Sequence, residues 1–172
     1  MKPIRRIVVA TDFSDCSAAA ARTAAELAEK LGAGIEVVTV LENTVPFTEA
    51  TGWMVLPAVA EEIRAAADEK LAEFAERHFA GMEGVYRQVR EGRPYEQIIK
   101  AAEDADADLI VVGTHGRTGL SHLLLGSEAE KVVRHSPLPV LTVKPAAVAA
   151  PAEPAAARAE ANGARRPEPV LS

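Results

Sequence analysis

A glycine-rich stretch carries the residues that point most directly to chemistry. It runs from Gly113 to Ser127, after an apolar run at 109–112 and before a helical pattern. Gly116 and Gly119 permit positive φ, so successive backbone amides can turn inward and form a nest for an anion. The unbonded amides and positive dipole end of the following helix favour the same kind of ligand. The stretch therefore predicts a phosphate site.

The same residues also have a purely structural interpretation. Ser127 and Glu130 fit the Ser-x-x-Glu capping box, in which the serine only holds the start of the helix. Glu128 suits the helix dipole in the first turn, although its charge would repel a nearby anion. The residues of this stretch are compatible with both interpretations, phosphate binding and helix capping.

Asp12 is a second candidate, because it directly follows the apolar run 7–10. In an open α/β sheet, ligands bind outside the carboxyl ends of the strands. Asp12 could accept hydrogen bonds from a ribose or help hold a divalent ion. Alternatively, it only bonds the amides of the following turn. A P-loop sequence and a Gly-x-Gly-x2-Gly sequence after a strand are both absent from the chain.

The other reactive side chains in the sequence do not form an evident catalytic centre. Ser127 has no evident base, and Cys16, the one cysteine, is expected to be a small turn or core residue. The histidines do not have the spacing of a zinc site. We therefore expect that the protein is not an enzyme with an efficient nucleophilic centre.

Short apolar runs alternate with helical patterns along the chain. The expected strands are 7–10, 35–41, 85–89, 109–112 and 140–143, and the expected helices are 15–31, 57–79, 94–104 and 127–134. This order predicts a parallel sheet with helices on both faces. The first and fourth strands lack polar alternation, as central strands do, whereas the third alternates and should lie nearer an edge.

Periodicity and terminal residues predict how the helices pack and end. Ser14 should cap the first helix and Gly32 should end it, and Pro94 suits the first turn of the third. The residues expected on buried helix faces are Ala20, Ala24, Leu27, Ala28, Leu31, Ile63, Ala67, Leu71, Phe74, Ile98, Ala129, Val132 and Val133.

Composition limits the class of protein. The chain has 172 residues, 48% hydrophobic and 26% charged, with a net charge of −6, which disfavours a broad grip on nucleic acid. No apolar run is long enough for a membrane span, and the apolar start is too short for a secretory signal, so we expect a cytoplasmic protein. An Ala- and Pro-rich composition after Pro145 predicts a domain at 1–145 and a flexible tail at 146–172.

The chain resembles the universal stress protein A family, specifically its ATP-binding branch. The family's phosphate motif, Gly-x2-Gly-x9-Gly-[Ser/Thr], matches Gly113, Gly116, Gly126 and Ser127 with the full spacing. The opening 9–14 and the segment 137–143 are similarly typical. The resemblance covers about residues 2–144.

The resemblance implies a doubly wound, Rossmann-like parallel sheet of five strands in the order 3-2-1-4-5. It implies ATP, with Mg²⁺, bound where the strand order reverses; the metal ligands are unknown. Glu128 often has an apolar counterpart in the family, and its carboxylate could repel the γ-phosphate, help hold Mg²⁺ or face solvent. By position, the implied nucleotide contacts are Thr11, Asp12, Val40, Val112, Gly113, His115, Gly116, Gly126, Ser127, Glu128 and Ala129.

Within this resemblance, base and ribose would meet Thr11 and Asp12, and the backbone of Val40 would bond adenine. Val112 and Gly113 would line the ribose and first phosphate, and the remaining contacts would surround the polyphosphate, largely through amides. The long segment Glu42–Leu56 is either a ligand lid or a hydrophobic flap.

The implied function is that of an ATP-binding regulator of the stress response, without nucleic-acid or membrane partners. The family implies a homodimer that pairs the last strand, Val140–Val143, although Pro139 and Pro145 could protect that edge instead. Two other functions stay open: a nucleotide-free interaction protein of the same fold, and a slow ATPase or phosphotransferase.

Overall fold

The chain forms one parallel α/β sheet with helices on both faces. The computed structural model describes residues 2–42, 57–114 and 125–144. The strands lie in the order β3-β2-β1-β4-β5, and every neighbouring pair is parallel, so the predicted fold is confirmed. The elements in chain order are β1 (Arg6–Ala10), α1 (Asp15–Leu31), β2 (Gly34–Leu41), α2 (Pro57–Phe79), β3 (Val85–Glu91), α3 (Pro94–Asp104), β4 (Leu109–Gly113), α4 (Ser127–His135) and β5 (Val140–Val143).

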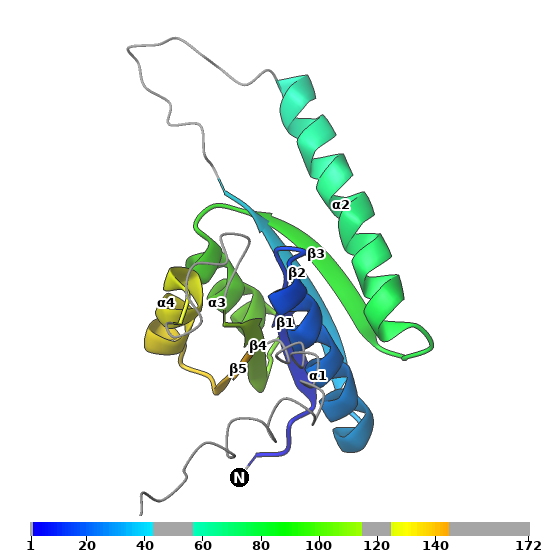
Figure 1. Ribbon diagram of the computed structural model, residues 1–172, viewed down its shortest axis with the longest axis vertical. Helices are drawn as coiled ribbons and strands as arrows, with labels where there is room; N and C mark the ends of the chain where they lie inside the picture. Colours follow the sequence, from blue (N-terminus) through cyan, green and yellow to red (C-terminus); the bar gives the residue numbers. More distant parts are fainter. Residues whose placement is uncertain (1, 43–56, 115–124, 145–172) are drawn as a thin grey trace, which may run out of the picture.

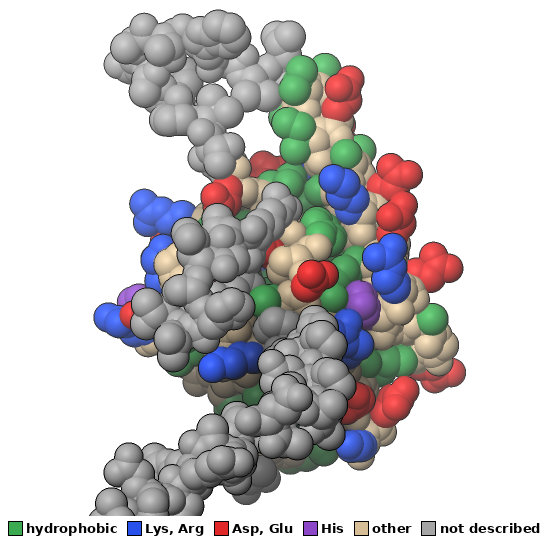
Figure 2. Space-filling view, in the orientation of Figure 1, with side chains coloured by type: hydrophobic (Ala, Val, Ile, Leu, Met, Phe, Trp, Pro, Cys, Tyr) green, Lys and Arg blue, Asp and Glu red, His purple; other side chains and the backbone are tan. Residues whose placement is uncertain are grey.

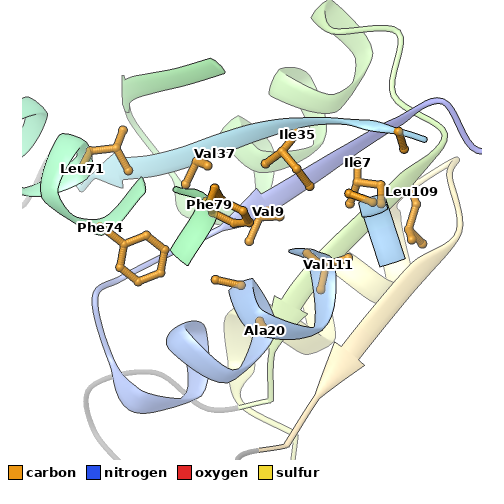
Figure 3. Close-up of a cluster of buried hydrophobic side chains, with 14 residues drawn as sticks. Ile7, Val9, Ala20, Ile35, Val37, Leu71, Phe74, Phe79, Leu109 and Val111 are labelled. Atoms are coloured by element: carbon orange, nitrogen blue, oxygen red, sulfur yellow. The ribbon is translucent and has the colours of Figure 1, made fainter. Parts of the chain in front are cut away.

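The core has two layers, one on each face of the sheet. Figure 1 shows the helices that lie along these faces. Successive strand side chains point to opposite faces, so Ile7 and Val9 pack under α1 and α2 while Val8 packs under α3 and α4. Figure 3 shows Val9 beside Val37 on the face that α1 covers. These strand residues are almost inaccessible to solvent, as expected for strands buried on both faces.

The helix boundaries follow the predicted caps. The Ser14 side chain accepts a hydrogen bond from the Ser17 amide at 3.3 Å and caps α1. Gly32 ends α1 in the left-handed region, with φ at 65°, where a side chain would be strained. Pro94 occupies the first turn of α3. β3 lies at one edge of the sheet, as its polar alternation predicts.

Three residues expected on buried helix faces are exposed instead. Leu31 is 49% exposed, Ile63 52% and Val133 46%. Leu31 is the last residue of α1, and Val133 is rotated one position from the fully buried Val132. Ile63 lies in the first half of α2, which extends past the sheet (Figure 1) and displays hydrophobic side chains (Figure 2). A helical stripe is buried only where another element lies beneath it.

Some expectations concern segments outside the described residues. These are the lid or flap at 43–56, the stretch 115–124 and the tail after Pro145. Within the described ranges, no helix has the length and apolar character needed to cross a membrane.

Candidate functional site

The predicted site residues gather at the carboxyl edge of the sheet. Thr11 follows β1, Val40 lies near the end of β2, and Gly113 ends β4. β1 lies between β2 and β4, so these ends are neighbours. The first turn of α4 starts at the same edge, whereas His115 and Gly116 fall outside the described residues.

Thr11 holds the turn between β1 and α1. Its amide donates to the carbonyl oxygen of Val38 at 2.9 Å and so extends the β1–β2 ladder by one bond. Its buried hydroxyl donates to Ser17 Oγ at 3.0 Å and accepts from the Phe13 amide at 3.0 Å. The hydroxyl therefore shapes the turn.

Asp12 is also tied to the turn. Its Oδ1 accepts hydrogen bonds from the Ser14 amide at 3.1 Å and from the Ser14 hydroxyl at 2.6 Å. The intervening Phe13 has φ at 67°, rare for a residue other than glycine, and its ring packs edge-on against Phe74. The turn bonding considered for Asp12 is thus present, and it fixes the half-buried carboxylate at the end of β1.

Val40 presents its backbone beyond the end of β1. The Val38 carbonyl faces β1, since it accepts from Thr11, and the Leu41 carbonyl faces the β3 side, since it accepts from Gly92. Strand residues alternate in the neighbour that they bond, so the amide and carbonyl of Val40 face the β1 side. The β1–β2 register stops at Ala10 and Val38, so Val40 lies beyond the last paired residues, at the carboxyl edge of the sheet.

Gly113 is explained by helix packing. A Cβ at this position would lie 2.9 Å from the carbonyl carbon of Cys16 and 3.0 Å from its oxygen, closer than real side chains approach. We expected this glycine to let the backbone approach a ligand. The structure shows that it lets the first turn of α1 pack against β4, which brings Cys16 to the same edge.

The ends of the glycine-rich stretch meet at its base. The Gly126 amide donates to the Thr114 carbonyl oxygen at 2.7 Å, and the Thr114 amide donates to Val143 of β5 at 2.9 Å. Gly126 is the N-cap of α4, with no side-chain cap, so the capping-box interpretation of Ser127 is wrong. Ser127 is instead the first helical residue.

The first turn of α4 offers amides for an anion. Its first intrahelical bond runs from the Glu130 amide to the Gly126 carbonyl oxygen at 2.9 Å. The amides of Ser127, Glu128 and Ala129 precede that bond and have no acceptor within the helix. The Ala129 side chain is buried in the core under α3 and α4, so only its backbone is available.

The Glu128 carboxylate makes two contacts with neighbouring groups of the protein. Its Oε2 accepts from the Tyr95 amide in the first turn of α3 at 3.1 Å, and its Oε1 pairs with Lys131 Nζ at 2.6 Å. The N-cap of α3, Arg93, supplies no side-chain cap, so Glu128 caps α3 from a neighbouring helix. The hydrogen bond to Glu128 raises the pKa of Lys131 above its usual value.

An open pocket of about 480 Å³ lies beside this contact. Tyr95 and Lys131 are not evident from the sequence as site residues, since Tyr95 lies 33 positions from Glu128; only the three-residue spacing of Glu128 and Lys131 hints at their pairing. Among the described residues, no three His, Cys, Asp or Glu side chains could hold a metal ion together. The pocket is lined by Glu42, Gly92, Arg93, Pro94, Tyr95, Glu128 and Lys131.

Comparisons with known proteins agree with this architecture. The model of the universal stress protein family matches residues 3–144. A universal stress protein of Methanocaldococcus jannaschii is 37% identical over 143 residues, which cover 81% of this chain and 82% of that protein.

Two solved structures add ligands to the comparison. A universal stress protein in complex with cAMP is 27% identical, with a TM-score of 0.64, and the match covers 84% of this chain and 99% of that one. The universal stress protein of Archaeoglobus fulgidus in complex with dAMP is 25% identical, with a TM-score of 0.51, over 83% of this chain and 100% of that one. The sequence match, the sheet order and the glycine motif together show that this chain belongs to the universal stress protein family.

Proposed function

We propose that the protein binds an adenine nucleotide, ATP in particular, at the carboxyl edge of the sheet and acts as a nucleotide-dependent regulator in the stress response. The observation that carries the proposal is the group of amides at Ser127, Glu128 and Ala129, which have no acceptor within α4. The start of α4 is bonded to Thr114, at the edge where the strand order reverses between β1 and β4. Family relatives in complex with cAMP and dAMP support an adenine nucleotide as the ligand.

Each part of the nucleotide has a matching group along this edge. Adenine would bond the amide and carbonyl of Val40 beside the Thr11 backbone. The ribose would lie near Asp12 and against Val112 and Gly113.

The phosphates would accept hydrogen bonds from the amides of α4, including that of the Gly126–Ser127 peptide. His115 and Gly116 of the glycine-rich stretch would contact the same phosphates. Backbone amides at a helix start need no cationic side chain to hold phosphate.

Mg²⁺ would come with the phosphates. This ion keeps several waters and binds few protein ligands, so it does not need a preformed cluster of carboxylates. Oδ1 of Asp12 is already bonded to Ser14. We therefore place the ion on the phosphates and water, and we assign no protein ligand.

The protein would hold ATP and would turn it over slowly if at all. Ser127 starts α4, and in the described part of the chain no histidine or carboxylate is hydrogen-bonded to its hydroxyl. A signalling role requires bound ATP to change a surface that a partner reads, and the β5 edge of a homodimer is one such surface. We expect the protein to act in the cytoplasm.

The amide donors are tested by replacing Ser127 with proline. The first helical position tolerates proline, and Gly126 has φ at −60° and ψ at 147°, which suits a residue before proline. Ser127→Pro removes one amide hydrogen and leaves α4 intact. We expect its affinity for ATP, measured by isothermal titration calorimetry, to fall about tenfold, or 1.4 kcal/mol.

Ser127→Ala is the matched control, because it removes the hydroxyl and keeps the amide. Thermal melts should show that both variants stay folded. Equal ATP affinities for the proline variant and the wild type would remove the α4 amides from the site. A wild-type protein that binds no adenine nucleotide at millimolar concentration would favour the nucleotide-free interaction protein.

A further inference from the structure

We infer that Glu128 is a specificity-determining residue of the nucleotide site, and that its carboxylate lowers the preference of the site for ATP over AMP. The inference rests on the proposed function and concerns the charge of the ligand that the site favours. It is carried by the position of Glu128 in α4 and by the two contacts that fix its side chain.

Glu128 belongs to the proposed phosphate site through its backbone. It is the second residue of α4, and its amide precedes the first intrahelical bond. A phosphate bound at this amide lies within one side-chain length of the carboxylate. An acidic side chain is therefore built into the turn that would hold the anion.

Two contacts hold the carboxylate in one position. Oε2 is bonded to the Tyr95 amide at 3.1 Å, and Oε1 to Lys131 Nζ at 2.6 Å. The Tyr95 amide is in the first turn of α3, so the carboxylate caps the start of that helix. Moving it away would leave the start of α3 without this cap.

The same contact occupies the lysine of α4. Lys131 is one turn along α4, and its ammonium is paired with Glu128. The nearby Arg93 is paired with Glu96. In the described residues, the first turn of α4 therefore presents amides and the Glu128–Lys131 ion pair.

The negative charge of the ligand then determines how strongly Glu128 opposes its binding. Amide hydrogen bonds to one phosphate are common to AMP, ADP and ATP, whereas every further phosphate adds negative charge. Repulsion from a fixed carboxylate grows with that charge, and the partly exposed setting makes it moderate. Glu128 thus costs ATP more affinity than it costs AMP.

Glu128→Gln separates this effect from the capping of α3. Glutamine keeps a carbonyl oxygen for the Tyr95 amide and removes the negative charge, which also frees the Lys131 ammonium. We expect the ratio of ATP to AMP affinity to rise about threefold to tenfold at low ionic strength. Calorimetric titration with AMP, ADP and ATP, with and without Mg²⁺, measures the ratio.

Glu130→Gln is the matched control. Glu130 lies on the same turn, has the same charge and is paired with Arg134 at the surface. Its substitution should change the ratio by less than about twofold. Lys131→Met should lower the ratio, because it leaves the Glu128 charge uncompensated.

The outcomes separate the two proposals. Nucleotide binding with an unchanged ratio in Glu128→Gln, or with an equal change in Glu130→Gln, would overturn the role of Glu128 and leave the proposed function standing. A wild-type protein that binds none of the three nucleotides would overturn both.

Discussion

At the scale of single residues, Asp108 shows how one carboxylate fixes the start of the sheet. It accepts hydrogen bonds from the Arg5 amide at 2.8 Å and the Arg6 amide at 3.2 Å, and Lys2 Nζ lies 2.7 Å from its second oxygen. These contacts, the Lys2 bond first, lower the pKa of Asp108 to about 2. The side chain is 7% exposed, so the charge is held where β1 begins beside β4.

Asp108→Asn should destabilise the protein at neutral pH. The folded carboxyl has a lower pKa than its ordinary value of 3.8, so its contribution is complete above that value and is lost as the pH falls towards about 2. We expect a loss of about 1–3 kcal/mol at pH 7, measured by urea denaturation. The difference from wild type should shrink as the solution is acidified below about pH 4.

Glu29→Gln is the control for this prediction, because Glu29 is exposed on α1. An Asp108→Asn protein as stable as wild type at pH 7 would show that the contacts at the start of β1 contribute little.

At the same scale, the sequence predicts which residues meet but does not predict all of their contacts. Asp12 and Gly113 lie at one edge because strand order alone brings them there. The reason for Gly113 depends on the distance to Cys16, and the cap of α3 depends on Glu128, which is far away in sequence. Such contacts arise from tertiary packing, which local patterns do not encode.

At the scale of elements, α2 divides into two halves with different energetics. Its second half packs Ala67, Leu71 and Phe74 into the core, whereas residues 58–66 are exposed. The sequence shows a single apolar stripe along both halves. Periodicity predicts which side of a helix is apolar, and the length of the sheet beneath decides how much of that side is buried.

Two truncations on α2 should differ strongly in their effect on stability. Leu71 is fully buried, so Leu71→Ala should cost about 2–5 kcal/mol in the free energy of unfolding. Ile63 is 52% exposed, so Ile63→Ala should cost less than about 1 kcal/mol. Chemical denaturation measures both. A loss at Ile63 as large as that at Leu71 would show that this side chain is covered in solution.

At the scale of the whole molecule, the two edges of the sheet decide how it can assemble. β5 is an edge strand with half-buried residues. The carbonyls of Pro139 and Val143 accept bonds from the β4 side, so the alternate residues Val140 and Thr142 face outward. The outward groups could pair with the same strand of a second copy, as proposed for the homodimer.

Thr142→Pro tests that assembly without disturbing the sheet. Proline removes an outward amide hydrogen, and edge strands tolerate proline at such positions. We expect a dimeric wild type and a folded, monomeric Thr142→Pro protein by light scattering coupled to size-exclusion chromatography. Leu141→Pro, which removes a bond to β4, should destabilise the fold instead. A dimer that persists in Thr142→Pro would place the subunit contact elsewhere.

The architecture as a whole was the most predictable level. The alternation of elements predicts a parallel sheet, because parallel strands need crossover helices. The strand order is what the resemblance to the family implies. The segments at 43–56 and 115–124 lie outside the described residues, so the predicted lid and the contacts of His115 and Gly116 stay predictions.

The bond between the Gly126 amide and the Thr114 carbonyl also bears on how such a protein can diversify. It anchors both ends of the intervening segment to the scaffold, independently of what that segment contains. We therefore expect substitutions between these anchors to change ligand selectivity while β4 and α4 keep their positions.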